Sequence, residues 1–217
     1  MSHPNHPVIA IDGTAASGKS TFARSLAQRL GYVYVNTGAM YRGITWYLQQ
    51  KSIPLDDPAA VASRIDSATI ETRIQNGELA FLIAGIDPLP HVREAKVNAE
   101  VSLVAQVSAV RKLLVAQQQG LATVSPLVME GRDIGTVVFP QTPYKFFLDA
   151  NVDIRAQRRS EQGENDVIRQ RDVLDQQRQN SPLTCAPDAF RLDSGSATVE
   201  ELIATALHHL ATLGLKI

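Results

Sequence analysis

The chain has 217 residues, of which 44% are hydrophobic and 20% charged, and its formal net charge at pH 7 is -1. This composition supports one core of ordinary domain size and excludes an intrinsically disordered chain. Because 21 basic residues are balanced by 22 acidic ones, the sequence argues against a nucleic-acid coat protein or a polybasic membrane binder. We therefore expect neither nucleic acid nor a membrane among the partners.

Nothing in the sequence suggests a membrane protein or an oxidising compartment. No hydrophobic run approaches the roughly 18 residues of a membrane span, and the polar N-terminus has no signal-peptide core. The single cysteine, Cys185, cannot form an intramolecular disulfide or a cysteine-based zinc site. These features predict a cytoplasmic protein. Since no long exposed apolar helix suggests an obligate dimer, we expect a monomer.

The first part of the chain has the pattern of a strand, a loop and a helix followed by a second strand. Residues 8–11 form a short apolar run that ends at Asp12-Gly13, as a buried parallel strand does. Helical spacing follows over residues 21–30. An expected strand over 32–35 and a helix over 39–50 complete a unit typical of a right-handed crossover in a parallel sheet.

The middle of the chain predicts a β-hairpin. Two runs, 69–74 and 79–84, flank Asn76-Gly77, which is the strongest short-range hairpin signal. We expect residues 60–105 to form a small insertion that carries this hairpin, followed by a long helical stretch to Gln119.

The parallel pattern returns in the last part of the chain. The expected strands cover residues 127–129, 146–148 and 190–192, and the expected helices cover 151–162, 166–179 and 198–213. The sequence therefore predicts a single α/β domain whose core comprises residues 8–59 and 106–217.

Residues 13–20 carry the strongest chemical signal. Their sequence, Gly-Thr-Ala-Ala-Ser-Gly-Lys-Ser, matches the phosphate-binding pattern G-x-x-x-x-G-K-[ST] at every fixed position. The motif follows an expected strand and opens an expected helix, so that backbone N–H groups and the helix dipole face phosphate oxygens. Lys19 is expected to reach the β- and γ-phosphates, and the Ser20 hydroxyl to ligate Mg²⁺.

Three classes of protein use such a loop: GTPase switches, ATP-driven motors and small-molecule kinases. A GTPase reads guanine with an N/T-K-x-D loop, and none of the six lysines stands in that context. A motor usually has a Walker-B strand that ends in Asp-Glu, whereas the third strand here ends in Glu130-Gly131-Arg132-Asp133. A kinase fits best. Seven of the 15 arginines lie between Arg132 and Arg178, and their planar forks match phosphate oxygens.

Four segments then carry a family resemblance: residues 11–21; Asn36-Thr37-Gly38-Ala39-Met40-Tyr41-Arg42; Glu-Gly-Arg-Asp-Ile-Gly-Thr-Val-Val-Phe-Pro at residues 130–140; and residues 171–178. In order and spacing the chain resembles bacterial cytidylate kinase, the (d)CMP kinase branch of the P-loop nucleoside monophosphate kinases, over residues 8–213. It departs from the family at Thr14, where proline is common, and at Asn36-Thr37, where Asp-Ser is usual.

The resemblance implies the α/β fold of these kinases: a parallel sheet flanked by helices, a small β-containing monophosphate-binding insertion at about residues 60–105, and a helical lid at about residues 151–165. It also implies that ATP, with Mg²⁺, is the phosphate donor. CMP or dCMP would be the acceptor, and the products would be ADP and CDP or dCDP.

The resemblance also assigns binding residues to each nucleotide. ATP would be bound by the phosphate loop and three lid arginines, namely Gly13, Thr14, Ala15, Ala16, Ser17, Gly18, Lys19, Ser20, Thr21, Arg155, Arg158 and Arg159. The acceptor would be bound by Thr37, Tyr41, Arg42, Ser102, Arg111, Arg132, Asp133, Arg171, Asp175 and Arg178.

Among the acceptor residues, Thr37, Arg42 and Arg132 would hold the phosphate. Ser102, Arg111 and Asp133 would read the edge of the cytosine ring, and Arg171 and Asp175 would bind the sugar or the phosphate. The residues implied to act in catalysis are Lys19, Arg132, Arg158 and Arg178, with Arg178 beside the transferring phosphoryl group.

Two other functions stay open: a kinase of the same fold that acts on another small metabolite, and a non-catalytic ATP-binding module that switches conformation. Single residues also allow structural interpretations. Asp12 either orders the loop or holds a metal-bound water, and Arg171 and Asp175, four apart on a helix, suit a plain ion pair. Arg24 and Arg29 are expected to face solvent.

Overall fold

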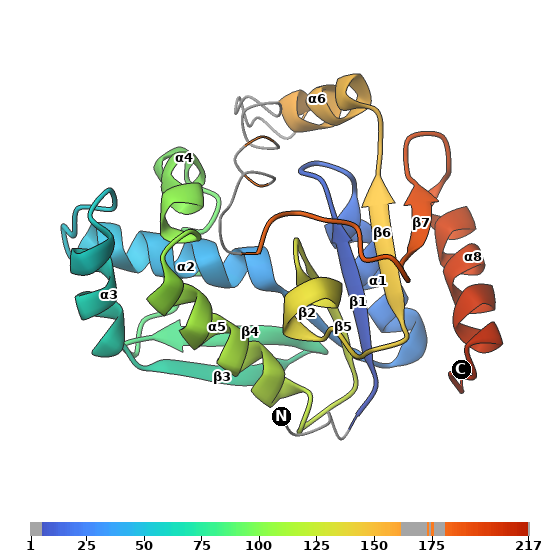
Figure 1. The fold of residues 1–217 in the computed structure, drawn as a ribbon, viewed down its shortest axis with the longest axis horizontal. Coiled ribbons are helices and arrows are strands. Elements are labelled where there is room, and N and C mark those ends of the chain that lie inside the picture. Colours follow the sequence, from blue (N-terminus) through green and yellow to red (C-terminus); the bar gives the residue numbers. More distant parts are fainter. Residues whose placement is uncertain (1–5, 162–172, 174, 176–180, 217) are drawn as a thin grey trace.

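Seven strands form one sheet in the computed structural model of the chain, which describes residues 6–161, 173, 175 and 181–216 (Figure 1). Across the sheet the order is β3 (Ile70–Gln75), β4 (Glu78–Ile83), β2 (Val33–Asn36), β5 (Leu127–Gly131), β1 (Val8–Gly13), β6 (Lys145–Asp149) and β7 (Phe190–Asp193). All neighbouring strands are parallel except β3 and β4, which are antiparallel. The expected α/β fold with a largely parallel sheet is confirmed.

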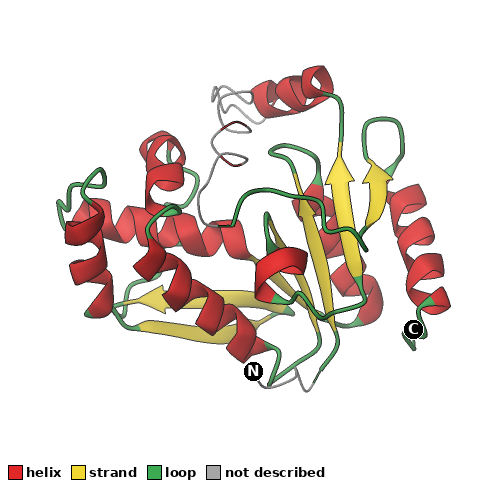
Figure 2. Ribbon diagram, viewed as in Figure 1, coloured by secondary structure: helices red, strands yellow, loops and turns green. Residues whose placement is uncertain are grey.

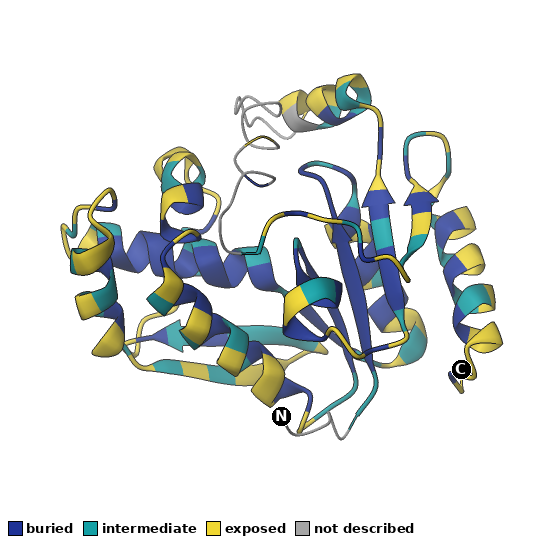
Figure 3. Cartoon of the chain, viewed as in Figure 1, coloured by how far each residue is buried: buried dark blue, intermediate teal, exposed yellow. Residues whose placement is uncertain are grey.

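The central strands are apolar because helices cover both faces of the sheet (Figure 3). Helices α1 (Lys19–Leu30) and α8 (Val199–Thr212) pack on one face, and helix α5 (Ser108–Leu121) and the π-helix η1 (Ile134–Val138) pack on the other. Along β1, Ile9 and Ile11 join the hydrophobic core on the α1 and α8 side, while Val8 and Ala10 join a second core on the α5 and η1 side. Since side chains alternate along a strand, Asp12 lies on the η1 side.

A third core fills the region around the hairpin, which Figure 2 shows beside the helices that cover it. Helices α2 (Thr37–Gln50), α3 (Pro58–Asp66) and α4 (Ala95–Val104) pack there with α5 and β4. Strand β4 also pairs with β2, at Tyr34 and Glu78, so the hairpin extends the main sheet. The division of the chain into a core and an insertion at residues 60–105 stays a prediction.

Most helices expected from the sequence are present, with ends shifted by a few residues. Helix α6 (Val152–Glu161) confirms most of the helix expected over 151–162, whereas the helix expected over 166–179 lies almost wholly outside the described residues. Helix α3 and the π-helix η1 were not expected. In the described part of the chain, no helix combines the length and the apolar character that crossing a bilayer demands.

Candidate active site

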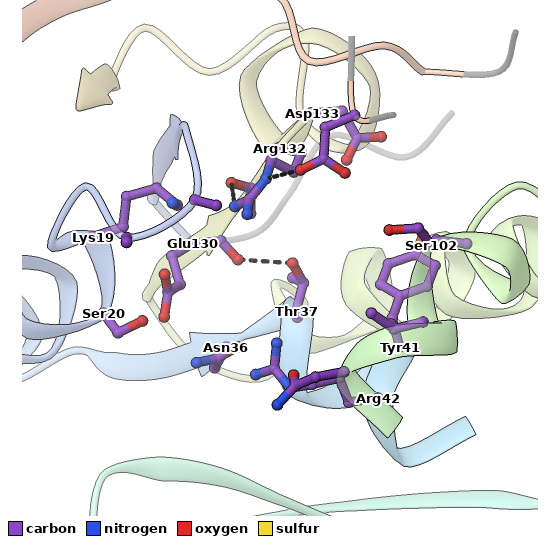
Figure 4. A pocket seen from close by; sticks show the side chains of 18 of the residues that line it. Lys19, Ser20, Asn36, Thr37, Tyr41, Arg42, Ser102, Glu130, Arg132 and Asp133 are labelled. Carbon is purple, nitrogen blue, oxygen red and sulfur yellow. Dashed lines mark hydrogen bonds and ion pairs between the residues drawn. The ribbon is translucent and has the colours of Figure 1, made fainter. Parts of the chain in front are cut away.

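The carboxyl ends of β1, β2 and β5 meet at one edge of the sheet, where a cavity of about 270 Å³ opens (Figure 4). In open parallel sheets this edge is where ligands bind. The cavity wall includes the loop after β1, the start of helix α1, the turn after β5, and residues of helices α2, α4 and α5. Of the expected site residues, it contains Ala15, Ala16, Lys19, Ser20, Thr21, Thr37, Tyr41, Arg42, Ser102, Arg111, Arg132, Asp133 and Asp175.

The loop after β1 requires glycine at two positions. Gly13 has a φ of +152°, and a Cβ placed there would lie 1.9 Å from the carbonyl oxygen of Leu148. Gly18, the N-cap of α1, has a φ of 80°. Glycine adopts such left-handed values without strain. The loop thereby leads into the N-terminus of α1, whose first N–H groups lack partners within the helix and suit a phosphate.

Lys19 is buried beneath this loop, and its Nζ donates to the carbonyl oxygen of Thr14 at 2.5 Å. Burial, and to a smaller extent the positive charge of Arg132, lowers the pKa of Lys19 to about 7, against the opposing effect of three nearby carboxylates. An anion beside the ammonium group favours its charged form. A bound phosphate would therefore raise the pKa of Lys19 again.

The first turns of α2 bring Thr37 and Arg42 into the cavity wall. The helix begins at the Asn36 cap, whose Oδ1 accepts the N–H of Ala39 at 2.8 Å. Thr37 Oγ1 donates to the carbonyl oxygen of Glu130 at 2.7 Å (Figure 4). This bond attaches the start of α2 to the end of β5 and so fixes where Arg42 enters the cavity.

Arg111 of α5 and Asp133 form an ion pair in the cavity wall, and their side chains are only 7% and 8% exposed. The Arg111 guanidinium also lies 5.7 Å from the centre of the Tyr41 ring. Ser102 of α4 lines the same cavity. This part of the wall combines a hydrogen-bond acceptor, a fork of donors and an aromatic face, which together suit a flat polar ring.

Arg132, on the turn after β5, pairs with Asp175, and the two side chains are 2.7 Å apart between Nε and Oδ2. The carboxylate of Asp175 is buried. The expected residues Arg171 and Arg178 lie outside the described residues, so the suggested pair between Arg171 and Asp175 stays a prediction.

Asp12, at the end of β1, is buried and does not line the cavity. Its two carboxylate oxygens accept the N–H groups of Ile134 and Gly135, each at 2.8 Å. Burial raises the pKa of Asp12 to about 6, although the two N–H groups act in the opposite direction. These bonds order the turn after β5 and not the phosphate loop, so the two roles left open for Asp12 stay predictions.

A polar network beside Lys19 has no counterpart in the sequence-based expectations. Tyr34 donates to Oε1 of Glu130 at 2.5 Å, and Glu130 lines the cavity. The Arg24 guanidinium lies 4.6 Å from the centre of the Tyr34 ring and donates to both carboxylate oxygens of Glu78, at 2.7 and 3.3 Å. Arg24 is exposed, as expected, and its guanidinium also ties α1 to β4 and borders the cavity.

The lid arginines of α6 contact the backbone around the phosphate loop. Arg155 Nη1 donates to the carbonyl oxygen of Ala15 at 3.2 Å, and Arg158 Nη2 donates to that of Ser194 at 2.7 Å. Neither borders the cavity, and the same holds for Gly13, Thr14, Ser17 and Gly18 of the phosphate loop. The roles of these residues toward ATP stay predictions, and the side chain of Arg159 lies outside the described part.

The cavity wall also contains residues to which the sequence assigned no role: Arg24, Asn36, Gly38, Arg93, Asn98, Val101, Ala105, Glu130 and Gly131. Asn36 is the last residue of β2 and Glu130 the last but one of β5, and this position alone could have indicated them. Arg93 and Asn98 lie just before and within α4. No local pattern marks those two, because the packing of α4 against α2 brings them to the cavity.

Known proteins have sequences similar to this chain along nearly its whole length. The model of the cytidylate kinase family matches residues 9–212. The chain is 41% identical to a cytidylate kinase of Bacillus licheniformis over 206 residues, which cover 89% of this chain and 91% of that protein. A cytidylate kinase of a Geobacillus species is 41% identical over 211 residues, with coverage of 92% and 94%.

A longer relative matches in one part only. The bifunctional pantoate ligase/cytidylate kinase of Prochlorococcus marinus is 41% identical over 214 residues, which cover 93% of this chain but 42% of that protein. The family model spans every strand of the sheet except the first residue of β1, and every element that lines the cavity. The chain therefore belongs to the cytidylate kinase family.

Proposed function

We propose that this kinase transfers the γ-phosphate of ATP to CMP or dCMP and releases ADP and CDP or dCDP. The observation that carries the proposal is the buried pair of Arg111 and Asp133, which lines the same cavity as Lys19 of the phosphate loop. One cavity thus offers groups suited to a base and groups suited to a triphosphate. The sequence relatives named cytidylate kinase support the same acceptor.

The chemistry of the pair favours cytosine. Cytosine presents an amino donor beside a ring nitrogen and a carbonyl oxygen that both accept. An ionised Asp133 only accepts and Arg111 only donates, so both can be satisfied by this edge. Uracil presents an acceptor where cytosine has the amino group and a donor at the ring nitrogen. It would therefore leave both buried groups mismatched.

Charge neutralisation is the second requirement, because ATP and a nucleoside monophosphate are both polyanions. Lys19, Arg42 and Arg132 face the cavity and would hold the two sets of phosphates in line. Positioning and electrostatic stabilisation supply most of the rate in phosphoryl transfer. An arginine at the transferring group, the role implied for Arg178, contributes roughly 10³- to 10⁵-fold in related reactions.

The donor set beside Lys19 fits Mg²⁺. The hydroxyl of Ser20 and the carboxylate of Glu130 both line the cavity, and hard oxygen ligands are what this ion prefers. Mg²⁺ is usually held by one or two protein oxygens together with nucleotide phosphates and water. Ser20 would be the direct protein ligand. When bound, the ion would neutralise charge on the β- and γ-phosphates.

The lid would protect the reaction from water. Arg155, Arg158 and Arg159 would close over ATP, so that transfer to the acceptor is favoured over hydrolysis. We propose that the protein acts as a monomer in the cytoplasm, with nucleotides as its ligands and neither nucleic acid nor a membrane as a partner.

A coupled assay of ADP release with CMP, dCMP, UMP, AMP and GMP tests the proposal. We expect kcat/KM for the two cytosine nucleotides to exceed that for the other three by at least about tenfold. A parallel preparation of Lys19→Ala controls for contaminating kinases. Equal rates with all five acceptors contradict the proposal. Turnover of a different small metabolite alone supports the other kinase function, and tight ATP binding without any transfer supports a switching module.

A further inference from the structure

The side chain of Asp12 has no part in the proposed reaction, yet both oxygens of its buried carboxylate accept hydrogen bonds. It is 4% exposed, and each of its oxygens accepts one backbone N–H, from Ile134 and from Gly135. Asp12 is separated from these residues by more than 120 positions. The contact therefore joins the end of β1 to the start of η1.

The two N–H groups belong to a turn that needs an external partner. They are the first amides of η1, and the first N–H groups of any helix have no acceptor inside it. On the other side of the same turn, the carbonyl oxygen of Asp133 accepts from Val137 at 2.9 Å and from Val138 at 3.2 Å. The backbone that carries Arg132 and Asp133 is thus held between Asp12 and the body of η1.

We propose that Asp12 is a positioning residue for the acceptor: its carboxylate holds the turn of residues 131–135 so that Arg132 and Asp133 enter the cavity at a fixed spacing. The inference rests on the proposed function for the identity of the acceptor. It assigns to Asp12 a role in selecting the acceptor, separate from any role in binding ATP.

Two features make a carboxylate necessary at this position. An asparagine offers one acceptor oxygen, and its amide N–H₂ would face the second backbone N–H, leaving a buried donor without a partner. Little space exists for another arrangement, since a Cβ on Gly135 would lie 3.4 Å from Asp12 Oδ2 and 3.1 Å from the Lys145 side chain.

The backbone of Asp12 is fixed independently of its side chain. Within the sheet Asp12 is paired with Gly131 of β5 and with Phe147 of β6. Gly13, the first residue of the phosphate loop, is in turn paired with Leu148. A change confined to the Asp12 side chain should therefore leave the phosphate loop in place and disturb only the turn.

The test is Asp12→Asn with full kinetics for both substrates. We expect KM for CMP to rise about tenfold and the preference for CMP over UMP to fall about tenfold, while KM for ATP stays within about twofold. Thr142→Val is the matched control, because Thr142 Oγ1 donates to the carbonyl oxygen of Val8 at the opposite end of β1, at 2.5 Å. That variant should lose stability without any change in the ratio of the two KM values.

The outcomes separate the inference from the proposed function. If Asp12→Asn raises KM for ATP as much as KM for CMP, or leaves the preference for CMP intact, the positioning role is refuted. If the wild-type protein does not phosphorylate CMP, the proposed function fails. The contact of the Asp12 carboxylate with the N–H groups of Ile134 and Gly135, here called the clamp, is then tested by amide hydrogen exchange. Exchange at these two residues should be slow in the wild type and at least about tenfold faster in Asp12→Asn. Equal exchange in both proteins overturns the inference.

Should Asp12→Asn fail to fold, Gly135→Ala tests the same clamp from the other side. Its methyl group would press on Lys145 and on Asp12 Oδ2, and we expect a smaller rise of about threefold in KM for CMP with KM for ATP unchanged. Equal KM values in Gly135→Ala and wild type would contradict the positioning role.

Discussion

Lys19 is the residue on which the proposed transfer depends most directly. Its ammonium group lies at the start of α1 in the cavity wall, where charge develops during transfer. We expect Lys19→Ala to lower kcat by at least about 10³-fold, since preorganised charge is worth that much in such sites, while the far-UV circular dichroism spectrum stays unchanged. Lys112→Ala, which removes an exposed lysine of α5, should retain full activity. Appreciable residual activity in Lys19→Ala would contradict its assignment.

Asp12 should make the stability of the fold depend on pH. Its pKa rises from 3.8 in an unfolded chain to about 6 in the native state, so the native protein binds this proton more tightly. The resulting stabilisation is fully present below pH 4 and is lost as pH rises through 6. Near neutral pH the loss amounts to about 3 kcal/mol, at 1.36 kcal/mol for each pH unit.

The difference between the wild type and Asp12→Asn isolates this effect from other titrating groups. Urea unfolding at pH 4 and at pH 7 should show that the free energy of unfolding of the wild type, relative to the variant, falls with rising pH. The charges that face Asp12 are those of Asp133, which raises its pKa, and Lys19, which lowers it. A difference that grows with pH would show that Asp12 is not buried as described.

At the scale of elements, two ion pairs connect helices to their neighbours and should differ greatly in energetic weight. Arg111 and Asp133 join α5 to the turn before η1 and are almost fully buried, whereas Arg24 and Glu78 join α1 to β4 with side chains 44% and 40% exposed. Breaking a buried pair leaves an uncompensated charge and destabilises by about 3–5 kcal/mol, while an exposed pair contributes about 1 kcal/mol or less.

Asp133→Ala should therefore lower the free energy of unfolding by several times as much as Glu78→Ala does. Urea titrations of both variants measure the two losses directly. Asp133→Ala should also weaken the selectivity for cytosine more than the affinity for ATP. Similar losses in the two variants would mean that the Arg111–Asp133 pair is solvated.

The elements that sequence reasoning predicted are those whose cause is local. The strand before the phosphate loop and the hairpin at Asn76-Gly77 are each specified by adjacent residues. Helix α3 also had a local signal, since Asp57 caps it and Pro58 opens it. The π-helix η1 had none, and the side chain that accepts its first two N–H groups, Asp12, is more than 120 residues away. Such distant partners are not encoded in local periodicity.

At the scale of the whole molecule, the same reasoning explains which parts of the site were predictable. The phosphate loop could be derived from spacing and context alone. The Arg111–Asp133 and Arg132–Asp175 pairs join residues 22 and 43 positions apart, and only the family resemblance grouped them. For the same reason the sequence did not show the ion pair between Arg24 and Glu78, which are 54 residues apart. A single sequence shows the groups but not the fold that brings them together.

The three cores should unfold as one unit. Leu79 packs against both the hairpin core and the η1 core, and β4 continues the main sheet. Trp46, the single tryptophan, is buried in the hairpin core and stacked on His91. We expect its fluorescence and the far-UV circular dichroism to report the same urea midpoint. An earlier fluorescence transition would show that the hairpin region unfolds separately.

The Arg111–Asp133 pair has a consequence for how errors are avoided. Because the two charges neutralise each other within the protein, an incoming ring competes with an internal partner and not with bulk water. A ring that hydrogen-bonds to only one of the two side chains leaves the other as a buried charge without a partner, which costs binding free energy. Selectivity between acceptors then comes more from the free-energy penalty on a mismatched base than from favourable contacts with the correct base. We therefore expect the wrong nucleotides to differ from the correct one by faster dissociation and not by slower association.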